Sequence, residues 1–571
     1  MQIGVIGWWS YDNQGDLAML SALRAGLSPH RVVPLDVGFA AHPDALYRLN
    51  RLDYVILGGG TLIPGKPGPP FDTFDTWQNQ LECPLGVVGL GVDPLIESYR
   101  PAVNTLIDHA RFFFVRDQAS FQLLGRPEVQ VAPDLTFAYP LQVERADCGK
   151  RERPLCGINL RKSARLDPHP WLEVIAQLPV EFRGIPLSSF ASFDESVLLR
   201  QLDPGCATAY ASGLYAGLDF MIGAAFHSVV FAVQAAVPVI AIAYAPKVRH
   251  FMEEIGLGQY VLSADAWGKL PELVDEVLTT RSHLRQGLET IREGLQHKAH
   301  QMFQTVEHEI AQSGQRHQPC DASVTVIVIG SGDRRKDERT LASCLAQTYE
   351  NLEVLFSPAE ESSQELAAIA TDRVTVTDAG SDYASRLQCA LTKAQGEYVT
   401  WLDSGDWLAE DALDCLVGRL EQDPSCDVLY SDYWLLSEAN MPVVTHYVPE
   451  AGKLYRRDVV GPCFLVRKRV LSTVGGFPVD SPLPTYGLWL ELSSVYRFTA
   501  FHAPLMYSAR QPRAPHVIVC ERAARRVWRK NLPAWRRTLW RIIDSDFGER
   551  FVVQPVARLN RLLRSVIYGR H

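Results

Sequence analysis

The sequence predicts an α/β protein in which three successive domains each contain a largely parallel sheet, followed by a basic helical tail. Short apolar runs that end in glycine alternate with helical stretches over residues 1–140, and this pattern restarts near Leu155 and again at Val324. A chain of 571 residues accommodates roughly three or four domains. Strand–helix alternation of this kind is typical of parallel sheets.

The first two domains are predicted as Rossmann-type halves, at residues 1–145 and 146–312. In the first, we expect strands in IGVIG, RVVPLDV, YVILGGG, GVVGLGV and FFFVRD, with a helix from about Leu17 to Ala25. In the second, we expect strands in CGINLR, VEFRGIPL, FMIG and VPVIAIAY, then long helices from Leu270 to Ile310. Ligands bind at the carboxyl ends of strands in such sheets, so we expect the site in a cleft between the halves.

A polar linker is expected at residues 313–323, before a third α/β domain at 324–510 and a tail at 511–571. From Arg510 onward there are 15 Lys and Arg residues against 4 Asp and Glu residues, although the whole chain carries a net charge of −9. The segment AWRRTLWRII (534–543) places apolar residues on one helical face and arginines away from it. Such a helix suits an anionic membrane surface, and packing on the third domain is the equal alternative.

Composition narrows the class of protein. Hydrophobic residues make up 47% and charged residues 21%, which is ordinary for globular proteins. Eleven cysteines include no C-x-x-C pair, which argues against a zinc ribbon, a thioredoxin-like site or a disulfide framework. No basic leader precedes the first strand, and no apolar run reaches the roughly 18 residues of a membrane span. We expect a cytoplasmic protein, peripheral to the inner face of the cytoplasmic membrane if the tail binds it, with no nucleic-acid partner.

Two loops in the first half carry candidate binding residues. Asn13 to Asp16 form N-Q-G-D between the first strand and the first helix, and Gly58 to Thr61 form G-G-G-T after YVIL. A purely structural interpretation has Asp16 capping the helix and Gly15 making the turn. A carboxylate at this helix start disfavours phosphate, so a functional loop here is expected to hold sugar hydroxyls.

Three cations end strands of the second half. Arg161 ends CGINLR, His227 begins the helix after FMIG, and Lys247 follows VPVIAIAY. Each alone is more often a solvated charge or, for His227, a satisfied core histidine. Together at equivalent strand ends, and within the family resemblance described next, they favour an anion site, and a histidine there can also move a proton.

The ordered set NQGDLA, GGGTL, GLGVDP, VRDQAS, APDLTF, GINLR and IGAAFHSVVFAVQAAVPVIAIAYAPK resembles the polysaccharide pyruvyl transferases over roughly residues 1–310. The resemblance implies a GT-B-like pair of domains that transfers a pyruvyl group from phosphoenolpyruvate to a sugar as a ketal, without a cofactor. It makes His227 and Asp16 the catalytic candidates, with His227 transferring the proton. Arg161 and Lys247 would hold the donor, and Asn13, Gly59 and Gly60 would hold the acceptor with Asp16.

One position departs from this family. Relatives commonly carry an arginine two residues before the histidine, where this chain has Ala225. Loss of a charge-assisted contact costs about 1.5–3 kcal/mol of binding. Arg161, Lys247 and Arg249 are the candidates to compensate, and a different donor is the alternative.

The third domain resembles family 2 glycosyltransferases of GT-A fold over roughly 323–510, through VTVIVIG, LEVLF, AQGEYVTWLDSGDWL, LYSDYW and GPCFLVRKRVLSTVGGF. The family holds a nucleotide-sugar through Mn or Mg on a D-x-D motif, here matched by Asp403 and Asp406 around Gly405. Acidic residues of relatives are replaced at Ser357-Pro358-Ala359 and before Leu488-Trp489-Leu490. A hard cation needs oxygen ligands and a base needs a titratable group. We therefore expect a degenerate domain that binds glycan or positions its partner domain.

The leading hypothesis is a pyruvyl transferase of cell-surface glycan synthesis. Its partners would be phosphoenolpyruvate and a glycan, nucleotide-sugar or lipid-linked sugar acceptor. One rival is a glycosyltransferase active through Asp403 and Asp406. The other is a non-catalytic glycan-binding or scaffolding protein, which Ala225 and Gly405 favour.

Overall fold

The computed structural model describes most of the chain. Its described residues are 1–9, 13–37, 42–63, 78–92, 99–139, 151–188, 194–208, 210–318, 320–359, 373–377, 382–436, 442–474, 477, 481–509, 520–525 and 528. The chain divides into two compact units, Met1–Gln318 and Pro319–His571. The expected tail helix at 534–543 lies outside the described residues.

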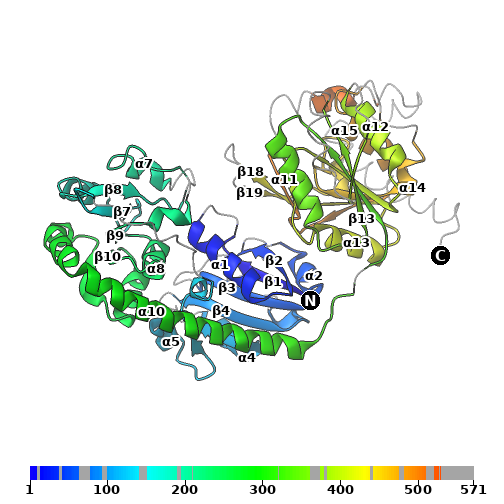
Figure 1. Ribbon diagram of the computed structural model, residues 1–571. Coiled ribbons are helices and arrows are strands. Elements are labelled where there is room, and N and C mark those ends of the chain that lie inside the picture. Colours follow the sequence, from blue (N-terminus) through cyan, green and yellow to red (C-terminus); the bar gives the residue numbers. More distant parts are fainter. Residues whose placement is uncertain are drawn as a thin grey trace, which may run out of the picture. The chain divides into compact units, whose positions relative to one another are not determined.

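The amino-terminal half of unit 1 contains a six-stranded parallel sheet of order β2-β1-β3-β4-β5-β6 (Figure 1). Its strands are β1 (Gln2–Gly7), β2 (Arg31–Asp36), β3 (Tyr54–Ile63), β4 (Leu85–Val92), β5 (Ala110–Val115) and β6 (Gln130–Val131). Its helices are α1 (Gln14–Gly26), α2 (Ala45–Asn50), α4 (Arg100–His109) and α5 (Gln118–Leu124), with short 3₁₀ turns η2 (Gln78–Gln80) and η4 (Leu135–Phe137). The strand order reverses between β1 and β3, and such a reversal opens a crevice at the carboxyl ends of these strands.

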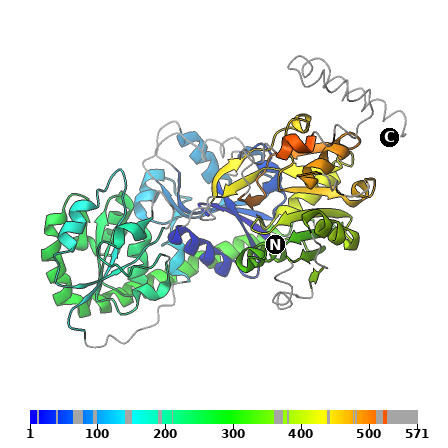
Figure 2. The same cartoon turned by 90° about the horizontal axis from the view of Figure 1, so that it is seen from above.

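The second half of unit 1 contains a five-stranded parallel sheet of order β11-β10-β9-β7-β8, with helices around it (Figure 2). Its strands are β7 (Leu155–Asn159), β8 (Glu181–Gly184), β9 (Phe220–Gly223), β10 (Val239–Ala243) and β11 (Val261–Ser263). The helical elements are α6 (His169–Ile175), α7 (Glu195–Leu199), α8 (Phe226–Gln234), α9 (Pro246–Glu254), η5 (Ser212–Tyr215), η6 (Gly258–Tyr260) and η7 (Trp267–Lys269). Here the order reverses between β7 and β9.

The strands are apolar because both faces of each sheet are covered. Every residue of β4, β7 and β9 is buried, and so is every residue of α8. A helix that is buried on all sides needs partners on all sides, and α8 lies between its own sheet and the first half.

One helix joins the two halves. The expected set of long helices is a single 44-residue helix, α10 (Leu270–Ser313), which runs along both sheets in Figure 1. Arg285, in its first part, donates a hydrogen bond to Leu218 O of the second half. Phe303, in its last part, packs on Gly26 of the first half, where a methyl group would lie 2.3 Å from the Phe303 ring. This continuous rod therefore fixes the halves to one another.

Unit 2 contains a mixed seven-stranded sheet of order β14-β13-β12-β15-β20-β17-β21 and a four-stranded sheet of order β16-β22-β18-β19. Antiparallel β20 separates the parallel strands β12–β15 from β17 and β21. The strands are β12 (Val324–Ile329), β13 (Leu352–Ser357), β14 (Val374–Val376), β15 (Tyr398–Asp403), β16 (Trp407–Leu408), β17 (Val428–Ser431), β18 (Tyr433–Leu436), β19 (Pro442–His446), β20 (Phe464–Arg467), β21 (Phe498–Phe501) and β22 (Met506–Ser508). The helices are α11 (Arg334–Leu345), α12 (Tyr383–Lys393), α13 (Ala412–Gln422), α14 (Lys468–Leu471), α15 (Pro484–Ser493) and η10 (Ala451–Lys453).

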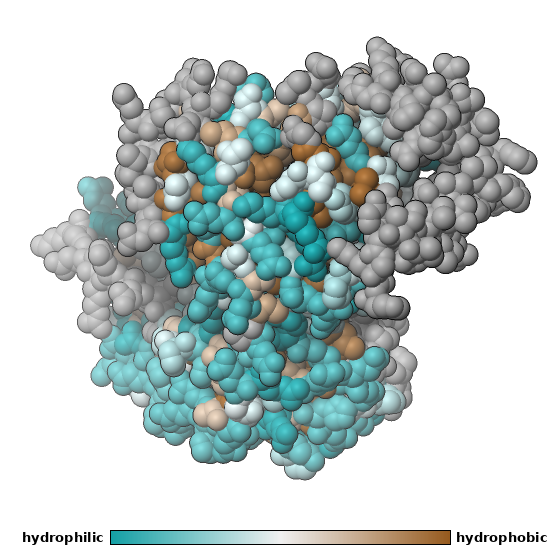
Figure 3. Space-filling view, turned by 90° about the vertical axis from the view of Figure 1, so that its right-hand side faces the viewer, coloured by the Kyte–Doolittle hydropathy of each residue, from teal (hydrophilic) through white to brown (hydrophobic). Residues whose placement is uncertain are grey.

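The molecular surface is mainly hydrophilic on the face drawn in Figure 3, where hydrophobic residues gather in the upper part. In the described part of the chain, no helix is long and apolar enough to cross a membrane. The cysteines of the described residues are free thiols.

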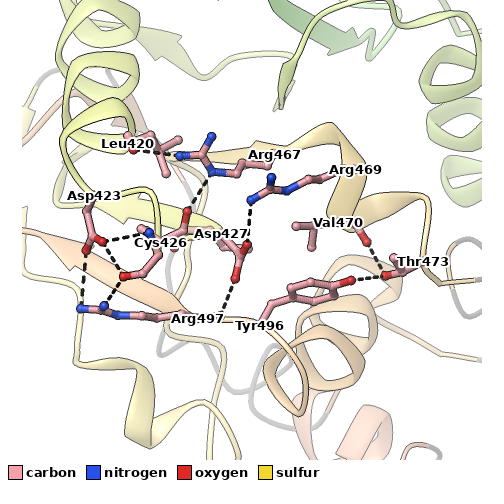
Figure 4. A network of polar contacts seen from close by, with 12 residues as sticks. Leu420, Asp423, Cys426, Asp427, Arg467, Arg469, Val470, Thr473, Tyr496 and Arg497 are labelled. Carbon is pink, nitrogen blue, oxygen red and sulfur yellow. Dashed lines mark hydrogen bonds and ion pairs between the residues drawn. The ribbon is translucent and has the colours of Figure 1, made fainter. Parts of the chain in front are cut away.

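A polar network holds the edge of the unit 2 sheet that lies opposite Asp403 (Figure 4). Buried Arg467, at the end of β20, donates to Cys426 O at 3.0 Å and to Leu420 O at 2.9 Å. Arg497 pairs with Asp423 at 3.5 Å, and its backbone N–H donates to Asp427. These contacts join α13, β17, β20 and β21. They stabilise the sheet whose opposite end carries Asp403.

Candidate functional site

A pocket of about 210 Å³ lies where the two strand-order reversals of unit 1 face each other. The first half contributes Trp8, Asn13, Asp16, Gly60, Thr61 and Arg116, and the second contributes Arg161, Leu187, Ser188, Glu195, Ala225, Phe226, His227, Tyr244 and Lys247. Six of the seven residues that the sequence singled out in unit 1 therefore meet in one place. The seventh, Gly59, lies behind the wall, where a methyl group would lie 2.9 Å from Trp9.

The start of α1 forms one wall. Asn13 caps the helix, because its side chain accepts a hydrogen bond from Gly15 N at 3.1 Å. The structural interpretation of Asp16 as the cap is therefore wrong, since Asp16 lies in the first helical turn and lines the pocket. Burial raises the pKa of the Asp16 carboxyl, and the nearby His227, Lys247 and Arg116 offset only part of this effect.

Gly60 leaves space beside Asp16. Its φ of +88° is in the region that favours glycine. A methyl group there would lie 3.5 Å from Trp8 and 3.8 Å from the Asp16 carboxylate. The glycine therefore keeps this side of the pocket open next to the carboxylate.

His227 is held by residues of the other half. The residue lies in the first turn of α8 and is 8% exposed. Its Nε2 lies 3.4 Å from Asp134 Oδ2. On the α1 side, a methyl group at Gly15 would lie only 1.8 Å from His227 Nδ1. The glycine of N-Q-G-D is therefore required for the imidazole to fit between α1 and Asp134.

Asp134, from the APDLTF segment, is an ionised partner for this imidazole. Burial alone would raise the pKa of Asp134, but the nearby His227 and two hydrogen bonds from Thr136 lower it to about 2. Sequence reasoning noted the motif without giving this residue a role. Only the fold brings it to His227.

Three permanent cations surround the same pocket, and one of them was missed from the sequence. Buried Arg116 directly follows β5, places its guanidinium 4.7 Å from the centre of the Phe226 ring, and donates to Thr61 Oγ1 at 3.2 Å. Lys247 Nζ lies 5.8 Å from the same ring. Arg161 lies 5.8 Å from the Tyr244 ring and donates to its hydroxyl at 3.5 Å. The signal for Arg116 was present, because it also ends a strand in the motif VRDQAS.

Gly91 makes room for Arg116. A methyl group at Gly91 would lie 2.4 Å from the Arg116 guanidinium. Two motifs of the sequence, GLGVDP and VRDQAS, therefore act together. At Ala225 the structure shows only a buried methyl group at the start of α8.

A buried asparagine shapes the second wall. Asn159 at the end of β7 accepts a hydrogen bond from Ala225 N at 2.9 Å and donates to Glu195 Oε2 at 2.7 Å. Glu195 Oε2 also accepts from Leu187 N at 2.8 Å. Burial raises the pKa of Glu195 to about 6, although Arg161 and these hydrogen bonds act in the opposite direction.

In unit 2, the candidate metal residues follow β15. Asp403 accepts a hydrogen bond from Tyr383 at 2.8 Å, and Asp406 is 7% exposed. Gly405 between them has a φ of +100°. In the part of the chain that the structure describes, no three His, Cys, Asp or Glu side chains are grouped so as to hold a metal ion.

The loop that carries these residues is nonetheless firmly held. Ser404 Oγ donates to buried Asp337, and Thr340 Oγ1 accepts from Gly405 N at 2.9 Å and donates to Asp406 O at 2.8 Å. At the neighbouring strand end, Arg386 donates to Gly330 O at 2.8 Å and to Ser357 O. Side-chain hydrogen bonds therefore hold the backbone at this end of the sheet in a defined conformation.

Two family models match the chain. The model for polysaccharide pyruvyl transferase matches residues 13–246, and the model for glycosyl transferase family 2 matches residues 338–474. Both resemblances drawn from the sequence motifs are thereby confirmed. No curated protein matches the sequence significantly.

Several solved structures match parts of this chain at low identity. S. aureus TarS 1–349 in complex with UDP is 16% identical, with 38% of this chain and 69% of that chain covered and a TM-score of 0.31. Anabaena HepE in complex with UDP and glucose is 13% identical, with 55% and 99% covered and a TM-score of 0.38. The mannosyltransferase PcManGT from Pyrobaculum calidifontis, in complex with GDP-Man and Mn²⁺, is 15% identical, with 44% and 89% covered and a TM-score of 0.27.

The contact between Gly15 and His227 predicts that Gly15→Ala destabilises unit 1. The added methyl group would overlap the imidazole, and overpacking costs roughly 1–3 kcal/mol. Urea unfolding measures this loss. The control is Gly287→Ala in α10, where a methyl group meets nothing within 4 Å and helix propensity adds up to about 1 kcal/mol. A Gly15→Ala variant as stable as the wild type would contradict the tight fit of the His227 imidazole against Gly15.

The pair of Asp134 and His227 predicts a pH dependence of stability. The pKa of Asp134 falls from an ordinary value of 3.8 to about 2 on folding, so its contribution is present above about pH 4 and lost as the pH falls through 2. The full effect is about 2 kcal/mol. From pH 5 to pH 3, the wild type should lose about 1 kcal/mol more unfolding free energy than Asp134→Asn. If the unfolding free energies of the two proteins, measured with urea, changed equally from pH 5 to pH 3, the ionised Asp134 carboxylate would not stabilise the fold.

Proposed function

We propose that the pocket of unit 1 transfers a pyruvyl group. The premise is that residues 13–246 are a polysaccharide pyruvyl transferase domain and residues 338–474 a glycosyltransferase family 2 domain. The donor would be phosphoenolpyruvate, and the acceptor a sugar of a cell-surface glycan or of its precursor. The observation that carries this proposal is the convergence of Arg116, Arg161, Lys247 and His227 on one pocket of about 210 Å³. Arg116, Arg161 and Lys247 outnumber the two carboxylates that line the pocket, those of Asp16 and Glu195, so the pocket suits an anion.

Phosphoenolpyruvate meets this requirement because it carries a phosphate and a carboxylate. Arginine forks pair with both groups, and the start of a helix such as α8 adds backbone donors. Arg116 supplies from the first half the guanidinium that Ala225 lacks in the second. Its ring contact with Phe226 keeps the guanidinium positioned without consuming all of its N–H groups.

The pyruvyl transfer needs an acid that protonates the methylene carbon of the donor, and we assign this step to His227. The ionised carboxylate of Asp134 lies 3.4 Å from Nε2, so we assign to Asp134 the role of orienting the ring. Cationic character then develops at the ketal carbon, which sugar hydroxyls attack as phosphate leaves. Asp16 and Asn13, beside the open space at Gly60, would orient the acceptor.

For unit 2 we propose a GT-A-like domain that binds glycan or positions unit 1 rather than one that transfers a sugar. Its candidate metal residues are one exposed carboxylate bonded to Tyr383 and one buried carboxylate. Of the residues expected to bind Mn or Mg, only Asp403 and Asp406 are present. The GT-B-like pairing of residues 1–145 and 146–312, the cytoplasmic location and membrane contact through the tail remain parts of the same proposal.

The donor site predicts the effect of removing either arginine. Arg116→Gln and Arg161→Gln should each weaken phosphoenolpyruvate binding by about 1.5–3 kcal/mol, the range for hydrogen bonds to charged groups. Isothermal calorimetry on the full chain measures this change. Arg249→Gln is the matched control, because Arg249 pairs with Glu253 on the exposed side of α9. Equal affinities of all three variants would exclude this pocket as the donor site.

Because we assign pyruvyl transfer to unit 1 alone, Asp403→Asn in unit 2 should leave the rate of pyruvyl transfer within about two-fold of wild type. Phosphate release from phosphoenolpyruvate with a panel of nucleotide-sugar and lipid-linked acceptors reports the rate. Manganese with common nucleotide sugars should give no saturable heat with the wild type. A micromolar, metal-dependent signal that Asp403→Asn removes would show an active glycosyltransferase instead.

A further inference from the structure

Glu195 has a buried carboxylate whose two oxygens differ in their hydrogen bonds. The residue is 2% exposed and belongs to the residues that line the pocket. Oε2 accepts both structural hydrogen bonds, from Asn159 Nδ2 at 2.7 Å and from Leu187 N at 2.8 Å. Oε1 has no hydrogen-bond partner among the described residues, and the nearest cation, Arg161 Nε, lies 3.9 Å away.

This arrangement is costly for a residue with only a structural role. A buried acceptor left without a partner costs roughly 1–3 kcal/mol, and more when it is charged. A glutamine would make the two contacts of Oε2 equally well through its carbonyl oxygen. The oxygen that distinguishes glutamate from glutamine is therefore the one without a hydrogen bond.

We propose that Glu195 is the general base that takes the proton from the acceptor hydroxyl when this oxygen attacks the donor. The inference rests on the proposed function, because it assigns the acceptor side of that same pocket. Arg161 beside Glu195 holds the donor, so an acceptor oxygen placed at Oε1 lies next to the carbon it must reach.

The protons balance over the two steps of ketal formation. In the first, protonated His227 gives a proton to the methylene carbon, the first hydroxyl oxygen bonds to the adjacent carbon, and Glu195 takes the hydroxyl proton. In the second, the carbon–oxygen bond to phosphate breaks and the second hydroxyl oxygen bonds to the same carbon. Neutral His227 takes that proton and protonated Glu195 gives its own to the leaving phosphate. Both residues thus return to their starting states.

The charge around Glu195 supports this role and narrows the acceptor. Arg161 faces it directly, and Asp16, His227, Lys247 and Arg116 line the same pocket. The pKa of about 6 leaves Glu195 ionised near neutral pH and close to the ideal strength for a base. With Asp16 and Glu195 on the acceptor side, the reacting ring is an uncharged sugar with two neighbouring hydroxyls rather than a uronic acid.

Glu195→Gln tests the inference with little risk to the fold, because only the oxygen without a hydrogen bond changes from acceptor to donor. Phosphoenolpyruvate binding is measured by calorimetry, and phosphate release is measured with phosphoenolpyruvate in molar glycerol, a minimal carrier of neighbouring hydroxyls. We expect donor affinity within three-fold of wild type and phosphate release at least roughly 100-fold slower, as for loss of a general base. Glu173→Gln on the exposed side of α6 is the control with the same charge change.

The outcomes separate the inference from the proposed function. Unchanged phosphate release in Glu195→Gln, or donor affinity weakened ten-fold as expected for a residue that only positions Arg161, would overturn the role of Glu195. Donor binding by the wild type without phosphate release in glycerol would overturn it as well. A wild type that does not bind phosphoenolpyruvate would instead contradict the proposed function itself.

Discussion

The contact between Gly15 and His227 is the constraint on which the site of unit 1 depends. The imidazole comes from α8 of the second half, yet Gly15 and Asp134, which lie against its two nitrogens, come from the first half. Close to it, Gln14 N donates to Leu187 O at 2.9 Å, and Gln234 donates to Thr136 at 2.7 Å. Any side chain larger than hydrogen at Gly15 would push the halves apart. The pocket therefore exists only while the two sheets meet at this point, and α10 holds them there.

The reversal of strand order explains why charge collects in this pocket. In each sheet, neighbouring strands at the reversal lead their loops to opposite faces, which leaves a crevice at their carboxyl ends. The two crevices face each other, so Asn13 after β1 and Gly60 within β3 line one pocket with Arg161 after β7 and His227 after β9. Burial of Asp134, Asp16 and Glu195 is compensated by Arg116, Arg161, Lys247 and His227. Among the residues that line the pocket, three permanent cations stand beside two carboxylates, which suits the proposed anionic donor.

The sequence was sufficient for the sheets and for the residues that end strands. Glycine-terminated apolar runs marked the strands, and Arg161, His227 and Lys247 followed directly from their positions. Arg116 obeys the same rule and was recognisable, although its motif was used only for the family resemblance. Asp134 and Glu195 were not recognisable, because their roles come from contacts across the fold, 93 residues apart for Asp134 and His227 and 36 for Asn159 and Glu195. The single helix α10 was also missed, since its continuity depends on packing against both halves.

The central claim is that this pocket holds phosphoenolpyruvate between the two halves of unit 1. A crystal structure of the full chain at saturating phosphoenolpyruvate tests it most directly. The account predicts that donor oxygens lie within hydrogen-bond distance of Arg116 from the first half and of Arg161 and Lys247 from the second. It also predicts that the methylene carbon lies beside His227. A donor bound elsewhere, or one that contacts cations of a single half only, would contradict it.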